Sequence, residues 1–196
     1  MSPQPQSGKS FRSFLGLPDS KPTPPSTVLI IVDAQNEYDH GLLAIHEVQK
    51  SRHAIGNVLE KWRNGGGEVV HILHKVPEGA PLFTPGTELA EEFEELKPRE
   101  AEKVIYKPHP CAFTDTPLDA HLKQLGKSKI VLVGYMAHVC ISATSRIGAE
   151  LGYDVSVVSD AIGDRDIPGA KAGQLVDTVL AELGDVSATI VKSGDL

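Results

Sequence analysis

The sequence has few cysteines, no long apolar run and no excess of basic residues. Its two cysteines, Cys111 and Cys140, are too few to form the disulfide framework that stabilises small secreted domains. No stretch of about 18 apolar residues is present, so we expect no membrane-spanning helix. The 19 basic and 26 acidic residues give a formal net charge of −7. Because nucleic acids and anionic membranes bind concentrated Lys and Arg, we expect neither as a partner.

Residues 1–26 are polar and rich in proline, and they lack the apolar stretch of a secretory signal. We predict a flexible extension there and a single domain over residues 27–196. Free thiols are typical of a reducing compartment. These observations favour a cytoplasmic protein, although a route of export that needs no signal peptide is left open.

Apolar runs alternate with helical patterns along the domain. The first run, Thr27–Val32, is polar on neither face, which is typical of a strand buried on both sides of a parallel sheet. Similar runs follow at Glu68–Leu73, Lys103–Tyr106, Lys129–Val133, Tyr153–Val158 and, as a candidate edge strand, Thr189–Val191. Helical patterns over 45–64, 118–125, 141–151 and 169–183 stop beside glycines. This order predicts an α/β fold with a doubly wound, mostly parallel sheet and helices on both faces.

The stretch Pro77–Pro98 interrupts this alternation. It contains four prolines and an acidic segment, Glu88–Glu95. The pattern predicts a long loop with one short helix, and long loops in compact domains often cover a functional site.

Reactive side chains follow three of the predicted strands. Asp33 comes directly after the first strand, Lys107 directly after Lys103–Tyr106, and Cys140 between Lys129–Val133 and the next helix. Ligands of open parallel sheets bind at the carboxyl ends of the strands, so we expect these side chains to share one edge. Taken singly, a buried cysteine, a turn-forming aspartate and a solvated lysine are ordinary alternatives.

The position of Cys140 suits a nucleophile. The amino terminus of a helix carries partial positive charge and unpaired N–H groups, which favour a thiolate and can hold an oxyanion. We expect Lys107 to lower the pKa of the thiol further. Asp33 could accept the thiol proton and later deliver it to the leaving group.

Three segments of the chain, taken in order, resemble the isochorismatase-like hydrolases, also called the cysteine hydrolase superfamily. They are Ile31–Asn36, Lys107–Phe113 and Gly134–Thr144, and the likeness extends over residues 27–191. The superfamily includes nicotinamidases, carbamoyl-amide hydrolases and isochorismatases. The resemblance implies a three-layer α/β/α hydrolase that acts on a small molecule and forms a homodimer or homotetramer.

The resemblance also implies roles for particular residues. Asp33, Lys107 and Cys140 would form a catalytic triad. A cis peptide between Tyr135 and Met136 would turn backbone N–H groups toward the substrate, and the N–H groups of Met136 and Cys140 would form the oxyanion hole. The side chains that would contact the substrate are Tyr38, Phe113 and Tyr135.

The sequence departs from some family members after the second strand. Nicotinamidases carry a metal-binding Asp-x-His motif there, whereas this chain has His74–Val76. His71 and His74 lie three residues apart on a strand and therefore face opposite sides, so they make a poor metal pair. We expect no metal or other cofactor. Cys111 stands where the family often has serine, and we expect it to pack in the core rather than react.

Two reactions fit these residues, and a third alternative is a non-catalytic member that binds a partner or metabolite. In the first reaction, which the triad favours narrowly, Cys140 attacks the carbonyl of a small amide and a thioester is hydrolysed. In the second, Asp33 protonates the vinyl ether of isochorismate, which is cleaved to pyruvate and 2,3-dihydroxy-2,3-dihydrobenzoate. The stretches Asp33–Asn36 and Met136–Val139 resemble those of isochorismatases.

Overall fold

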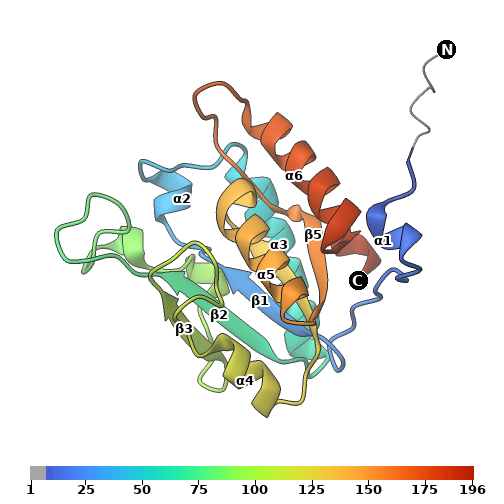
Figure 1. Cartoon of the computed structure of the whole chain (residues 1–196). Coiled ribbons are helices and arrows are strands. Elements are labelled where there is room, and N and C mark those ends of the chain that lie inside the picture. Colours follow the sequence, from blue (N-terminus) through green and yellow to red (C-terminus); the bar gives the residue numbers. More distant parts are fainter. Residues whose placement is uncertain (1–7) are drawn as a thin grey trace.

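The predicted strands assemble into one parallel sheet. The computed structural model describes residues 8–196, and residues 1–7 lie outside the described residues. The sheet has six strands in the order β3-β2-β1-β4-β5-β6 (Figure 1). They are β1 (Val28–Val32), β2 (Val69–His74), β3 (Lys103–Lys107), β4 (Lys129–Gly134), β5 (Asp154–Ile162) and β6 (Thr189–Val191). All neighbouring pairs are parallel, which confirms the predicted α/β fold.

Helices cover both faces of this sheet (Figure 1). α3 (Val48–Asn64) lies on one face, and α4 (Leu118–Gln124), α5 (Ser142–Glu150) and α6 (Ala172–Val186) lie on the other. Shorter helical elements are α1 (Phe11–Phe14), α2 (Glu37–His40), the 3-10 turns η1 (Glu88–Ala90), η2 (Glu94–Leu96) and η4 (Ser193–Asp195), and the π-helical turn η3 (Ala137–Ile141). No helix within residues 8–196 is both long and apolar enough to span a bilayer.

The continuous apolar run of β1 follows from its central position. Val28, Ile30 and Val32 pack toward α4 and α6, while Leu29 and Ile31 pack toward α3, and all five are fully buried. Burial of one such side chain contributes about 1.5–3 kcal/mol, so a strand apolar on both faces is strongly held at the centre of the sheet.

The chain reverses direction across the sheet between β1 and β4. It builds outward from β1 to β2 and β3, and then returns to build β4, β5 and β6 on the other side of β1. At such a switch point a crevice opens at the carboxyl ends of the two strands. Gly134 ends β4 here with φ +114°, and a Cβ at this position would lie 2.0 Å from the carbonyl oxygen of Val32. Only glycine allows the two strands to approach this closely.

The segment Pro77–Pro98 differs from its prediction. Instead of one short helix it forms η1 and η2, separated by an antiparallel bridge between Gln35 and Glu92. The N–H of Phe93 donates to the carbonyl of Ala34 at 2.9 Å. Because residues 91–93 pair with the loop after β1, their backbone is extended and cannot continue a helix.

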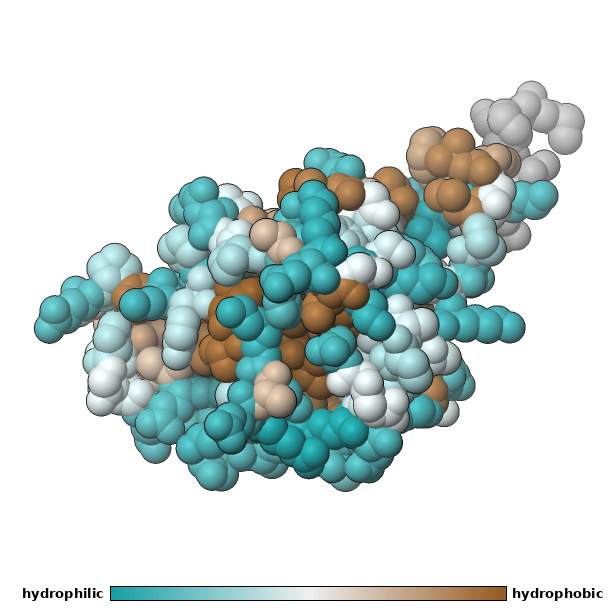
Figure 2. Space-filling view, turned by 90° about the horizontal axis from the view of Figure 1, so that it is seen from below, coloured by the Kyte–Doolittle hydropathy of each residue, from teal (hydrophilic) through white to brown (hydrophobic). Residues whose placement is uncertain are grey.

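Residues 8–26 run along one end of the domain. The N–H of Phe11 donates to Asp185 of α6 at 2.8 Å, and the N–H of Ser20 donates to the side chain of Thr189 in β6 at 2.9 Å. Phe11 and Phe14 of α1 are exposed. Figure 2 shows an apolar patch beside the grey residues at the end of the chain. The flexible extension over residues 1–26, part of which lies outside the described residues, and the domain boundary at residue 27 stay predictions.

Candidate active site

Asp33, Lys107 and Cys140 meet at the carboxyl edge of the sheet. Lys107 ends β3, and its side chain crosses the end of β2 to place Nζ 2.7 Å from Oδ2 of Asp33 and 3.4 Å from Sγ of Cys140. Nζ also donates to the carbonyl of His109 at 3.0 Å. Asp33 and Lys107 are fully buried, and Cys140 is 4% exposed. The carboxyl edge of the sheet therefore holds the three side chains in contact, as the sequence predicted.

The backbone of Asp33 adopts a left-handed conformation. Its φ is +51°, which is uncommon for a residue other than glycine and costs on the order of 1–3 kcal/mol. The turn is fixed because the N–H of Asp33 donates to Ile72 at 2.8 Å and its carbonyl accepts from Gln35 at 2.8 Å. Among residues 8–196, the ammonium of Lys107 and the thiol of Cys140 are the only groups that interact with the oxygens of this buried carboxyl.

Cys140 lies in the π-helical turn η3 rather than in the first turn of a regular helix. The peptide between Tyr135 and Met136 is cis, as the resemblance implied. The carbonyl of Met136 accepts from the N–H groups of both Val139 and Ile141 at 3.2 Å. Within the described residues the N–H of Met136 itself donates to no protein acceptor. An oxyanion hole formed by the N–H groups of Met136 and Cys140 stays a prediction.

The protonation of the site differs from the sequence-based expectation. Burial raises the pKa of Cys140, and the charge of Asp33 raises it further, while Lys107 lowers it without reversing the shift. This shift is opposite to the lowering expected from Lys107, because the loss of hydration outweighs the nearby cation. Burial also raises the pKa of Asp33, and the ion pair with Lys107 opposes that shift. Both acids consequently hold their protons more firmly than they would in water.

His74 was not assigned a role from the sequence, yet it contacts the site. Its Nδ1 lies 3.3 Å from Nζ of Lys107. Burial and the charge of Lys107 lower the pKa of His74 to about 4, so the ring is neutral near pH 7 and can accept a hydrogen bond from the ammonium. Gln35 fixes this strand end, because its Oε1 accepts from the N–H of His74 at 2.8 Å and its Nε2 donates to Ala90 at 2.8 Å.

The three predicted substrate-contact residues pack among other aromatic rings. Tyr38 lies against Phe83 and Tyr135, with ring centroids 5.3 and 5.5 Å away. The hydroxyl of Tyr135 lies 2.7 Å from that of Ser51 on α3. Phe113 stacks on Tyr153 at 5.5 Å. All three are nearly buried in this conformation, and contact with a substrate stays a prediction for each.

A second polar pair near Cys140 was missed by sequence reasoning. His138 is held by Asp164, whose Oδ2 lies 2.7 Å from Nδ1 of the ring and accepts from the backbone N–H of His138 at 2.9 Å. Asp164 follows the end of β5, which extends to Ile162. Because the apolar run of this strand stops at Val158, the sequence placed its end too early to bring Asp164 to the site.

A cavity of about 740 Å³ lies between Pro77–Pro98 and the edge of the sheet. Its wall includes Leu73, His74, Val76, Phe83, Pro98 and Tyr106. His74 lines the cavity and also contacts Lys107, and its ring lies against Phe83 with the ring centroids 5.1 Å apart. Asp33, Lys107 and Cys140 do not line this cavity, so the prediction that Pro77–Pro98 covers a functional site stays a prediction.

Comparisons with known proteins agree with this fold. The family model described as "Isochorismatase domain" matches residues 27–185. The secreted isochorismatase effector Isc1 of Verticillium dahliae is 54% identical over 187 residues, covering 95% of this chain and 98% of that protein. A streptothricin hydrolase of Streptomyces noursei is 32% identical, over 82% of this chain and 57% of its own length. An isochorismatase structure from Pseudomonas putida superposes with a TM-score of 0.93 at 28% identity, covering 96% of this chain and 99% of that one.

The relative from Verticillium dahliae also corrects the expected location. It is described as a secreted effector, which contradicts the cytoplasmic location inferred for this chain. That inference relied on the missing apolar stretch in residues 1–26, a feature that bears on a single route of export. The matching family model, the relatives and the shared fold show that the chain belongs to the isochorismatase family of hydrolases.

Proposed function

We propose that this protein hydrolyses the vinyl ether of isochorismate, with Asp33 as the group that delivers and recovers the proton. Asp33 protonates the terminal methylene carbon of the enolpyruvyl group, which leaves an oxocarbenium ion. Water adds to that ion and returns a proton to Asp33. Collapse of the resulting hemiketal transfers its hydroxyl proton to the ether oxygen, breaks the ether C–O bond and releases pyruvate and 2,3-dihydroxy-2,3-dihydrobenzoate.

The protonation of the site carries this choice. A general acid works best when its pKa is raised toward the working pH, and burial has this effect on Asp33. Covalent catalysis instead needs a thiolate, whereas the pKa of Cys140 is raised by burial and by Asp33. Lys107, 2.7 Å from Asp33, would stabilise the carboxylate that remains after the proton is delivered.

The relative Isc1 supports the same substrate, because it is 54% identical over nearly the whole chain and is described as an isochorismatase. This reverses the order in which the sequence alone ranked the two reactions. Since the same relative is described as secreted, we infer that this protein is exported too. Detection of the protein in culture filtrate, with an intracellular enzyme as the lysis control, tests the inference, and retention inside washed cells would contradict it.

Amide hydrolysis through a thioester is the second candidate. It is favoured by the contact of 3.4 Å between Nζ of Lys107 and Sγ of Cys140, which would assist thiolate formation once a substrate approaches. The streptothricin hydrolase among the relatives supports this chemistry. In this reaction Asp33 takes the thiol proton and passes it to the departing amine, and water then cleaves the thioester.

A paired assay of variants distinguishes the two reactions. Wild type, Asp33→Asn and Cys140→Ala are assayed on isochorismate and on a panel of small amides, with Cys111→Ala as the matched control for loss of a buried thiol. For isochorismate we expect Asp33→Asn to lose about 10²–10⁴-fold in rate, the usual contribution of a general acid. Cys140→Ala should keep a rate within about tenfold of wild type.

The opposite pattern would overturn the proposal. Turnover of an amide that Cys140→Ala abolishes, with no cleavage of isochorismate by wild type, would establish the thioester reaction. Binding of isochorismate or an amide without turnover of either by folded wild-type protein would favour the non-catalytic alternative.

A further inference from the structure

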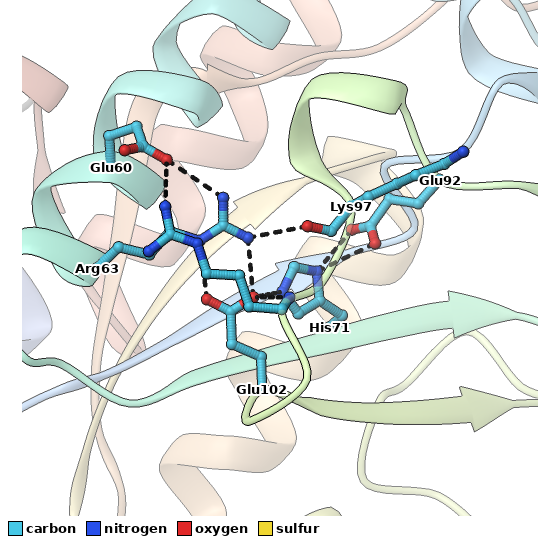
Figure 3. A network of polar contacts seen from close by, with 7 residues as sticks. Glu60, Arg63, His71, Glu92, Lys97 and Glu102 are labelled. Atoms are coloured by element: carbon cyan, nitrogen blue, oxygen red, sulfur yellow. Dashed lines mark hydrogen bonds and ion pairs between the residues drawn. The ribbon is translucent and has the colours of Figure 1, made fainter.

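A buried histidine lies between two carboxylates on the face of the sheet that α3 covers. His71 belongs to β2, is fully buried and faces α3 (Figure 3). Its Nδ1 lies 2.9 and 3.1 Å from the two oxygens of Glu92. Its Nε2 lies 3.1 Å from Oε2 of Glu102. Each ring nitrogen therefore has a carboxyl oxygen as its partner.

These contacts require one more proton than a neutral histidine and two carboxylates carry. A neutral imidazole has a single N–H and can donate to only one of the two partners. Glu102 is held as a carboxylate: burial raises its pKa, but hydrogen bonds from Arg63 and from the N–H of Arg99 lower it to about 2. The additional proton therefore lies between His71 and Glu92, on either the ring or the carboxyl.

Glu92 belongs to the segment that covers the site. Its neighbour Phe93 donates its N–H to Ala34, and the N–H of Asn36 donates to Glu91, both at 2.9 Å. Ala34 directly follows Asp33 in the chain. The side chain of Glu92 thus fastens Pro77–Pro98 to the sheet at the point where that segment pairs with the loop that carries Asp33.

We propose that His71 and Glu92 form a latch that one shared proton closes, and that loss of this proton at alkaline pH releases the segment Pro77–Pro98 from the site. Both are positioning residues, because they act through the paired backbone of residues 34–36 and 91–93. The latch itself is independent of which substrate is hydrolysed, and only its effect on KM rests on the proposed function.

The direction of the pH effect follows from proton linkage. The charged groups of the network come from β2, α3 and the chain before β3, and they are Glu60, Arg63, His71, Glu92, Arg99 and Glu102. Burial raises the pKa of Glu92, and the contact with His71 opposes the shift. In the open form, with the segment Pro77–Pro98 released, histidine and glutamate lie in water and lose their protons at about pH 6.5 and 4.3. The closed form, in which His71 and Glu92 share the proton, therefore binds it more tightly than the open form. Exchange of one proton changes the ratio of closed to open protein by up to about tenfold per pH unit.

Hydrogen exchange on the full-length protein tests the latch without any substrate. The N–H groups of Phe93 and Asn36 report opening directly, because both are hydrogen-bonded across the pair of segments. In wild type we expect their protection, corrected for intrinsic exchange, to be constant below about pH 6.5 and to fall by up to tenfold per unit at higher pH. In Glu92→Gln the amide can donate to a neutral His71, so above about pH 6.5 we expect protection that does not change with pH.

The control is Glu94→Gln, an exposed position on the same segment whose side chain pairs with Lys97. It should keep the wild-type pH dependence. Protection in wild type that does not change with pH would overturn the proposal, and so would a Glu92→Gln variant that keeps the dependence. On the enzyme, KM should rise at alkaline pH in wild type but not in Glu92→Gln, with kcat changing little. If isochorismate is not a substrate, the exchange measurements still decide the question.

Discussion

Substitution of Gly134 by alanine tests whether the close approach of β1 and β4 is required beneath the site. A Cβ there would lie 2.0 Å from the carbonyl oxygen and 2.8 Å from the carbonyl carbon of Val32, and these are backbone atoms that cannot rotate away. The backbone strain at φ +114° costs about 1–3 kcal/mol, and forced separation of packed strands costs a further ~1–3 kcal/mol. We therefore expect a loss of roughly 2–6 kcal/mol, a large part of the stability of an ordinary domain.

The matched control is Gly152→Ala. Gly152 also has a positive φ, +90°, but no described atom lies within 4 Å of the position that its Cβ would take. It should therefore lose only the conformational part, about 1–3 kcal/mol. Urea unfolding followed by circular dichroism gives both values, provided that the slope m is unchanged. A Gly134→Ala variant that is no less stable than Gly152→Ala would refute the reasoning about the contact with Val32.

Three further predictions concern charge and assembly. In Lys107→Met the buried carboxyl of Asp33 loses its ion pair, so the pKa of Asp33 should rise further. The variant should lose about 3–5 kcal/mol of stability relative to wild type where the carboxyl stays ionised. Urea unfolding should show a smaller loss at pH 5 than at pH 8. The pKa of His74 is lowered to about 4 in the folded protein, so the unfolded state binds a proton first as pH falls from about 6.5 to 4. Wild type should therefore lose stability over this range of pH, and His74→Gln should lose less. We expect light scattering to show a dimer or tetramer of the 21.0 kDa chain, and a monomer throughout the micromolar range would contradict this.

The sheet and the meeting of the three site residues could be predicted because each depends on local pattern and topology. A strand that is apolar on both faces, such as Val28–Val32, has only the centre of a parallel sheet to occupy. Once parallel strands are assigned, their carboxyl ends must lie at one edge, and this places Asp33 and Lys107 together although they are far apart in sequence.

Side-chain pairing could not be predicted in the same way. His71 was recognised only as a poor metal ligand, because nothing in a single sequence shows that Glu92 and Glu102 pack against opposite sides of its ring. The same limit applies to His138 and Asp164, which meet only because β5 is longer than its apolar run. Such pairs depend on how loops fold back onto the sheet, and loop paths do not follow from hydrophobic periodicity.

The protonation of Cys140 shows why residue order alone leaves the chemistry open. A cysteine before a helix and beside a lysine suggests a thiolate, but the structure buries Cys140 with Asp33 as well as with Lys107. The attraction of the cation is then divided between two acids, and the oxygen atom at 2.7 Å competes more effectively for it than the sulfur atom at 3.4 Å. The charge of Lys107 therefore acts on Asp33 more strongly than on Cys140, and burial still raises the pKa of both acids.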